Sequence, residues 1–155
     1  CVYPVSEGMQ VFTNTPKVQD SRRMTLELML ASHCRDCTAC EKNRSCRLQE
    51  MAVRFGIHHV HFKDTREHVP MDFSSPAVTF DLNKCILCGD CVRMCNEIQR
   101  VGAIDFAGRG SKMTISTVFD IPISESVCVG CGQCEDKCPE KCIRMVHGEN
   151  LRARK

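Results

Sequence analysis

The sequence predicts a small α+β protein that depends on metal or cross-links for its stability. The chain has 155 residues, of which 14 are cysteine, and its aromatic residues are seven Phe and one Tyr without any Trp. Burial of apolar surface alone would therefore give a thin core. Helical and extended patterns both occur, and the cysteines lie between them in groups. Chains of this composition commonly add disulfides or metal to their folding free energy.

Charge and hydropathy exclude two classes of function. The formal net charge is +2, and no long basic run suggests binding to nucleic acid. The longest apolar-rich stretch, residues 24–31, contains Thr25 and Glu27. It is far shorter than the roughly 20 apolar residues that a membrane-spanning helix needs. We therefore expect a cytoplasmic protein without a membrane span.

The first segment, residues 1–20, is rich in turn-forming residues and too small to fold alone. Within it, residues 2–13 show a strand-like alternation that includes Met9 and Val11. The chain begins at Cys1 rather than at Met. This start indicates either a processed chain or a part of a longer polypeptide.

Two helices are predicted in the next segment, residues 21–60. The first, over residues 21–32, places Met24 and Leu28 on one face, and the second covers residues 47–55. Gly56 then occupies the position of a C-terminal cap. The first group of cysteines lies between these two helices.

Residues 61–76 are polar and rich in histidine, which predicts a linker and the main domain boundary. The following domain, residues 77–147, carries several short extended patterns. Strands are expected near residues 78–82, 103–107, 113–119 and 143–146, with the second and third forming a hairpin. Residues 148–155 form a basic tail.

An internal repeat organises the cysteines of this domain. The pattern C-x2-C-x2-C-x3-C begins at Cys85 and recurs at Cys128, and a glycine follows the second cysteine in both copies. The fourth cysteine is followed by Asn96 in the first copy and by Pro139 in the second. Such duplication predicts one kind of site used twice.

This spacing is typical of cubane 4Fe-4S clusters. Three cysteines at three-residue spacing wrap one face of a cluster, and in two-cluster ferredoxins the fourth cysteine ligates the other cluster. The sequence therefore predicts two crossed ligand sets. One is Cys85, Cys88, Cys91 and Cys138, and the other is Cys128, Cys131, Cys134 and Cys95.

Zinc and disulfides explain the same cysteines less well. Zinc prefers two separated cysteine pairs around a tetrahedron, unlike three cysteines in strict steps of three residues. Cysteines three residues apart on a tight loop have poor geometry for disulfides, and nothing in the sequence indicates secretion.

A third ligand set lies between the two helices. His33, Cys37, Cys40 and Cys46 could hold another 4Fe-4S cluster through one imidazole and three thiolates. Cys34 offers an alternative, because it would complete an all-thiolate set without the histidine. Thiolate is the commoner ligand, and the residues alone leave both sets open.

The motifs also resemble a known family. Residues 13–56, together with Val11 and Phe12, contain V-x-T-N-T-P-K-V, R-R-M-x-L-E-L and H-x3-C-x2-C-x5-C. They look like the N-terminal electron-transfer segment of FeFe hydrogenases, and like the large iron-sulfur subunits of NADH dehydrogenases and NAD-linked formate dehydrogenases. The stretch D-L-N-K-C-I-L-C-G-D-C is similar to the two-cluster domain that follows this segment in the hydrogenases and formate dehydrogenases.

The resemblance covers almost the whole chain and implies three parts. These are the end of a plant-type 2Fe-2S ferredoxin domain over residues 1–20, a helical His/Cys3 4Fe-4S domain, and a bacterial two-cluster ferredoxin-like domain. The family ligates the cluster of the helical domain through the histidine, here His33, and often has proline at the position of Cys34. Cys1 would be the fourth ligand of a 2Fe-2S cluster if the polypeptide extends upstream.

Three cysteines and three histidines have no role in these ligand sets. They include Cys1, Cys34 and Cys142. Cys142, four residues beyond Cys138, is expected to be a buried or free thiol, with a ligand role as the alternative. His58, His59 and His61 are expected to face solvent from the polar connector.

The predicted function is electron transfer. No group of acid, base and nucleophile residues suggests a catalytic site. The resemblance implies an iron-sulfur relay in an anaerobic, multi-subunit, NADH-linked hydrogenase or formate dehydrogenase. Such a complex could also be electron-bifurcating. Its partners would be a flavin- and NADH-binding subunit and a catalytic subunit or ferredoxin. The alternatives are a free ferredoxin-like carrier, a redox-sensing binding module, and the N-terminal piece of a hydrogenase polypeptide.

Overall fold

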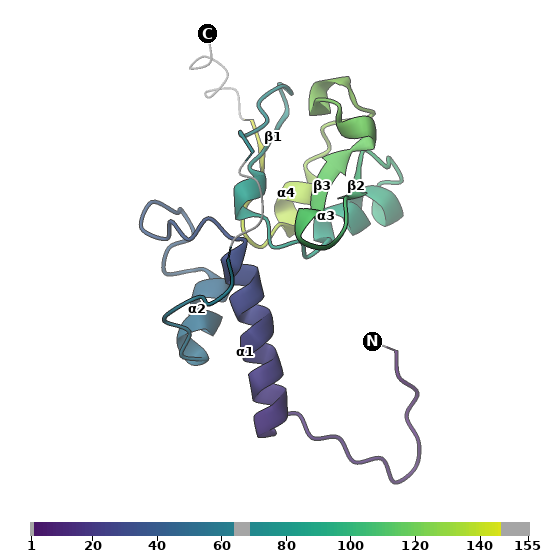
Figure 1. Ribbon diagram of the computed structural model, residues 1–155. Helices are drawn as coiled ribbons and strands as arrows, with labels where there is room; N and C mark the ends of the chain where they lie inside the picture. The colour runs from purple at the N-terminus through teal and green to yellow at the C-terminus, as the bar shows by residue number, and fades with distance from the viewer. Residues whose placement is uncertain (1, 64–68, 147–155) are drawn as a thin grey trace.

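The computed structural model describes residues 2–63 and 69–146, so Cys1 and the basic tail lie outside the described residues. It shows a small mixed helix and strand protein, which confirms the predicted α+β class. Helices α1 (Pro16–Ala31) and α2 (Arg47–Arg54) lie at one end, and the strands lie at the other (Figure 1). Among the described residues, no helix has the length and apolar character needed to cross a bilayer.

Helix α1 begins five residues before the predicted start at residue 21, because Thr15 and Pro16 form a better N-terminus. The Thr15 side chain accepts a hydrogen bond from the Val18 N–H at 3.3 Å, and proline suits the first helical position. Helix α2 begins at the predicted residue, and its N-cap is a cysteine. The Cys46 Sγ atom accepts a hydrogen bond from the Gln49 N–H at 3.4 Å.

The expected strand over residues 2–13 is wrong. These residues are exposed along their whole length and form no strand within the described part of the chain. An alternating pattern becomes a stable strand only when a neighbouring strand satisfies its backbone groups. No such neighbour stands beside this segment in Figure 1.

Two small antiparallel sheets form the rest of the scaffold. The predicted hairpin is confirmed: β2 (Ile104–Ala107) pairs with β3 (Thr114–Thr117). Strand β1 (Val78–Phe80) pairs with β4 (Ile143–Met145), which joins the two ends of the two-cluster region. The connections contain α3 (Asp90–Arg93), α4 (Gln133–Lys137), the π-turn η2 (Met94–Ile98), and the 3-10 turns η1 (Leu82–Lys84), η3 (Gly110–Lys112), η4 (Val118–Asp120) and η5 (Ile123–Glu125).

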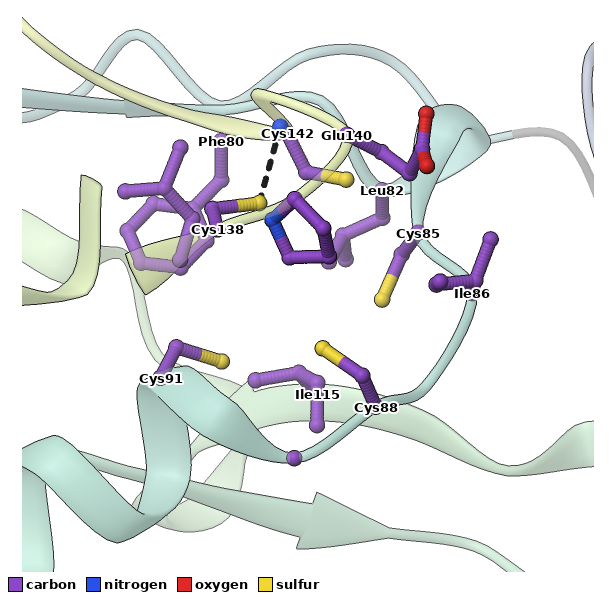
Figure 2. Close-up of a pocket in the computed structure, with 13 residues that line it drawn as sticks. Phe80, Leu82, Cys85, Ile86, Cys88, Cys91, Ile115, Cys138, Glu140 and Cys142 are labelled. Atoms are coloured by element: carbon purple, nitrogen blue, oxygen red, sulfur yellow. Dashed lines mark hydrogen bonds between the residues drawn. The ribbon is translucent and has the colours of Figure 1, made fainter. Parts of the chain in front are cut away.

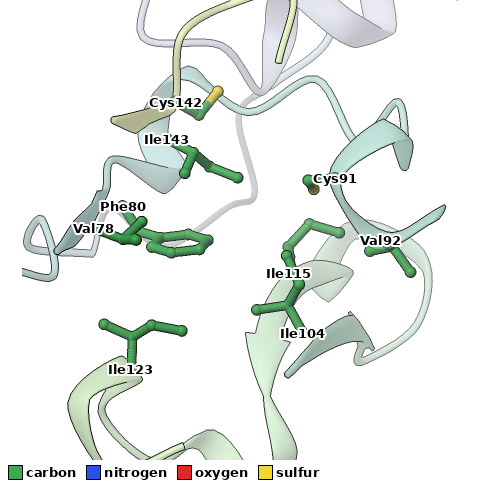
Figure 3. Packing of buried hydrophobic residues seen from close by; sticks show 9 residues of the cluster. All are labelled: Val78, Phe80, Cys91, Val92, Ile104, Ile115, Ile123, Cys142 and Ile143. Atoms are coloured by element: carbon green, nitrogen blue, oxygen red, sulfur yellow. The ribbon is translucent and has the colours of Figure 1, made fainter. Parts of the chain in front are cut away.

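The hydrophobic core lies between the two sheets (Figure 3). It consists of Val78, Phe80, Cys91, Val92, Ile104, Ile115, Ile123, Cys142 and Ile143. Two of these nine residues are cysteines, and other cysteines pack against the group. The core and the predicted cluster sites therefore share the same walls.

The glycine that follows the second cysteine of each repeat is required by the backbone conformation at that position. Gly89 and Gly132 are the N-caps of α3 and α4, with φ values of +74° and +78°. In this left-handed region a side chain is unfavourable. A Cβ on Gly89 would also meet the Phe106 ring at 2.8 Å. These glycines let each loop turn sharply from its second cysteine into a helix that carries the third.

The predicted linker is more structured than expected at its C-terminal end. Asp72 forms an antiparallel bridge with Phe80, and its carboxylate accepts a hydrogen bond from the Ile123 N–H at 3.3 Å. This segment therefore lies along β1 as part of the two-cluster region.

Candidate iron-sulfur sites

Four cysteines from both repeats line one pocket, which we call the Cys85 site. They are Cys85, Cys88, Cys91 and Cys138. Figure 2 shows these four side chains around a common space. Cys85 follows η1, Cys91 belongs to α3, and Cys138 caps the end of α4. The structure thus brings together the crossed set that the spacing predicts.

The other four cysteines line a second pocket, the Cys128 site. They are Cys95, Cys128, Cys131 and Cys134. Cys95 comes from the π-turn η2, and Cys134 comes from α4. Phe80 lines both pockets, so the two sites lie on either side of one aromatic ring.

The donor set of each pocket fits a polynuclear iron-sulfur cluster. Each pocket contains its four predicted ligand thiols, and apolar side chains such as Ile115 or Val78 form much of the remaining wall. Within residues 2–63 and 69–146, no group of three or more His, Cys, Asp or Glu side chains is arranged to hold a single metal ion. Four cysteine donors are the ligand set that a cubane 4Fe-4S cluster requires, because each cysteine binds a different iron.

The thiols of these pockets are electrostatically crowded. Burial and the neighbouring Cys85 raise the pKa of Cys91 to about 12. Burial and Cys131 raise the pKa of Cys134 to about 11. Iron ligation requires thiolates, so cluster binding must displace protons from these two cysteines, and the positive charge of the iron compensates for their repulsion.

The pKa of Cys138 is instead lowered. A side-chain hydrogen bond from Cys142 lowers the pKa of Cys138 to about 6, and backbone N–H donors add to this effect against that of burial. One of these donors is the Cys142 N–H, at 3.2 Å from the Cys138 Sγ atom. The turn after α4 therefore favours the thiolate of this ligand.

The third predicted set lies between α1 and α2. His33 is buried, with 9% of its surface exposed, and its Nδ1 atom lies 3.6 Å from the Cys34 Sγ atom. In one tautomer Nδ1–H donates to this sulfur, and Nε2 is then the nitrogen that would bind iron. In the other tautomer Nδ1 accepts from the Arg35 N–H at 3.3 Å. The structure thus gives Cys34 a possible role as a partner of the histidine.

The three cysteines of this set have different surroundings. Burial, Cys40 and Cys34 together raise the pKa of Cys37. Within the described residues, the contacts of Cys46 are instead with α2 and with Glu140. The Cys46 Sγ atom donates to Glu140 Oε2 at 3.4 Å. Because Glu140 also lines the Cys85 site, this contact joins the helical segment to the two-cluster region.

Two features of this region were missed from the sequence. His58, His59 and His61 are exposed, as expected, but His61 Nδ1 lies 3.3 Å from a carboxylate oxygen of Glu27 on α1. Cys142 is a buried thiol, as expected, but it also lines the Cys85 site as a fifth sulfur. Its spacing of four residues from Cys138 is the only sequence signal for this position.

Comparison with known families gives two matches along the chain. Residues 22–61 match the NADH-ubiquinone oxidoreductase-G iron-sulfur binding region. Residues 84–145 match the 4Fe-4S dicluster domain. The first match contains the His33 set, and the second contains both four-cysteine pockets.

Similar proteins carry both regions in the same order as parts of longer chains. The chain is 37% identical to the NADP-reducing hydrogenase subunit HndD of Solidesulfovibrio fructosivorans, over 90% of this chain and 24% of that protein. It is 36% identical to the G 2 subunit of the NADH-quinone oxidoreductase of Rhizobium meliloti, over 90% of this chain and 16% of that protein. It therefore spans a quarter or less of the length of these two relatives.

A solved structure supports the same relationship. The NAD+-reducing [NiFe]-hydrogenase in the H2-reduced state contains a chain that matches with a TM-score of 0.79 and 26% identity. The match covers 94% of this chain and 62% of that chain. The chain is thus similar to the iron-sulfur segments of the G-type subunits of NADH-quinone oxidoreductases and of NAD(P)-linked hydrogenase subunits.

Proposed function

We propose that the chain is an iron-sulfur electron relay of a multi-subunit NADH-linked oxidoreductase. The observation that carries this proposal is the pair of four-cysteine pockets on either side of Phe80, with a His/Cys segment joined to one of them. Relatives include NADPH-Fe(3+) oxidoreductase subunit alpha of Geobacter sulfurreducens, which is 33% identical over 90% of this chain and 16% of that protein. The names of these three relatives all describe NADH-, NADPH- or NADP-linked redox enzymes.

We assign three 4Fe-4S clusters to the described residues. Their proposed ligands are the four cysteines of the Cys85 site, the four of the Cys128 site, and His33 with Cys37, Cys40 and Cys46. Each cluster, when bound, can accept and donate single electrons. The protein holds the thiolates, excludes water with apolar walls, and fixes the order of the sites. An upstream 2Fe-2S domain would use Cys1 as its last ligand.

Contacts between the sites suggest the order of the relay. Glu140 contacts Cys46 and lines the Cys85 site, while Phe80 lies between the Cys85 and Cys128 sites. Electrons would therefore pass between the helical segment and the Cys128 site through the Cys85 site. The ends of this relay would serve a flavin- and NADH-binding subunit and a hydrogenase subunit, a formate dehydrogenase subunit or ferredoxin, in an anaerobic cytoplasm.

Anaerobic co-purification tests this assignment directly. The native protein, tagged and isolated from its own cells, should come with a flavin-containing subunit, and NADH should reduce its clusters within that complex. Isolation as a stable monomer that NADH does not reduce would contradict the subunit assignment and favour a free carrier.

A further inference from the structure

Cys142 places a fifth thiol in a site that needs four. Its side chain is 5% exposed and lines the Cys85 site together with the four proposed ligands. Figure 2 shows the Cys142 and Cys138 side chains next to each other at this pocket. The Cys142 N–H also donates to the Cys138 Sγ atom at 3.2 Å. The fifth thiol therefore lies in the same pocket wall as the proposed ligands Cys138 and Cys85.

The backbone holds Cys142 against the Cys138 ligand. The Lys141 N–H donates to the Cys138 carbonyl at 3.4 Å, and the Cys142 N–H donates to the Cys138 Sγ atom at 3.2 Å. Lys141 adopts a φ of +52°, which is unfavourable for a residue with a side chain. This strained residue lies in a tight turn from Cys138 to Cys142, and the turn places Cys142 at the wall of the pocket.

The repeat shows that a fifth thiol is not a requirement of the fold. Cys142 lies four residues after Cys138, and the equivalent position after Cys95 is Gln99. Gln99 lines the Cys128 site just as Cys142 lines the Cys85 site. At this position of the repeat, one pocket therefore has an amide and the other has a thiol.

We propose that Cys142 is an alternate fourth ligand of the Cys85 site, able to replace Cys138. This inference rests on the proposed function, because it requires that the site holds a cluster. In the exchange, the iron bond to the Cys138 sulfur breaks and that thiolate takes up a proton. Cys142 loses a proton and forms the new iron bond. One thiolate replaces another, so no electron is transferred and the charge of the site is unchanged.

The test compares the two fourth ligands in the full chain, isolated anaerobically. Wild type and Cys142→Ala should both contain about twelve irons, because all native ligands of three cubanes remain. Cys138→Ala should also keep about twelve irons, with an altered EPR spectrum for one reduced cluster. Cys95→Ala, where Gln99 offers no thiol, and Cys138→Ala/Cys142→Ala should each lose cubane iron and its EPR signal.

The result that overturns the inference is loss of the cubane from Cys138→Ala to the same extent as from Cys95→Ala. A three-iron signal in oxidised Cys138→Ala would count against it equally, because three cysteines alone can retain such a cluster. If the wild-type protein itself lacks iron, the proposed electron-relay function is contradicted. This result differs from loss of iron in Cys138→Ala alone, which contradicts only the alternate-ligand inference.

A second variant covers the case in which Cys138→Ala does not fold. Cys95→Ala/Gln99→Cys places a thiol at the equivalent position of the Cys128 site. If this position can supply the fourth ligand, the added cysteine should restore the irons that Cys95→Ala loses. Failure of this rescue in a folded protein would contradict the inference.

Discussion

At the scale of single residues, His33 and Cys34 show what sequence spacing can and cannot decide. Both residues can complete the third ligand set, and the pattern alone favours neither strongly. The structure buries His33 and places its Nδ1 atom 3.6 Å from the Cys34 Sγ atom. Metal-bound histidines usually have such a partner at the second ring nitrogen. This arrangement supports His33 as the ligand and Cys34 as the group that orients it.

Substitution of these two residues should therefore have unequal effects. His33→Ala should remove about four of about twelve irons, because the helical segment loses one of its four ligands. Cys34→Ser should retain the iron, since a hydroxyl can still contact Nδ1. Iron analysis, with nitrogen hyperfine couplings in the reduced wild type, measures the difference. Retention of the cluster in His33→Ala and its loss in Cys34→Ser would reverse the assignment.

The eight cysteines of the two pockets were easier to group than the third set. Their strict spacing and duplication determine which three share a loop, and the short reach of that loop explains why the fourth comes from the other repeat. Cys142 could not be placed in this way. Its proximity to Cys138 depends on the strained backbone of Lys141, which has no signature in a sequence of this kind.

At the scale of elements, local signals predicted the structure wherever they were strong. The hairpin of β2 and β3 has alternating strands around a glycine-containing turn, and it forms as expected. The start of α1 was misplaced because Asp20 and Thr15 are both good caps, and the following Pro16 decides between them. The strand-like pattern of residues 2–13 failed because strand formation depends on a partner that the pattern itself does not contain.

The hairpin turn offers a test of this account with an internal control. Gly108 has a φ of +73°, and a Cβ there would clash with the Lys112 carbonyl oxygen. Gly110 has a φ of +59°, but a Cβ there would meet nothing within 4 Å. Gly110→Ala should cost about 1 kcal/mol from backbone strain alone. Gly108→Ala should cost roughly 2 kcal/mol or more, because the turn must also shift.

Chemical denaturation of the cluster-loaded protein, followed by the visible absorbance of the clusters, compares the two variants. The midpoint should fall further for Gly108→Ala than for Gly110→Ala. Equal midpoints would show that the hairpin adapts to the added methyl group and that the close approach is unimportant.

At the scale of the whole molecule, the two repeats form one unit because each site takes cysteines from both. Strands β1 and β4 join the ends of this unit, and Phe80 of β1 separates the two sites. The helical segment is attached through Cys46 and Glu140, and through an ion pair between Glu41 and Arg144. The order of the sites in space thus follows their order in the chain. Sequence patterns predicted the sites themselves, while the contacts between them required the fold.

We propose that this chain holds three cubane clusters in succession. Anaerobic iron and sulfide analysis of the purified chain, combined with EPR during stepwise reduction, measures their number. We expect about twelve irons and about twelve sulfides per chain, and three reduced 4Fe-4S signals. About eight irons with two signals would remove the His33 site, and a smaller content would contradict the relay itself.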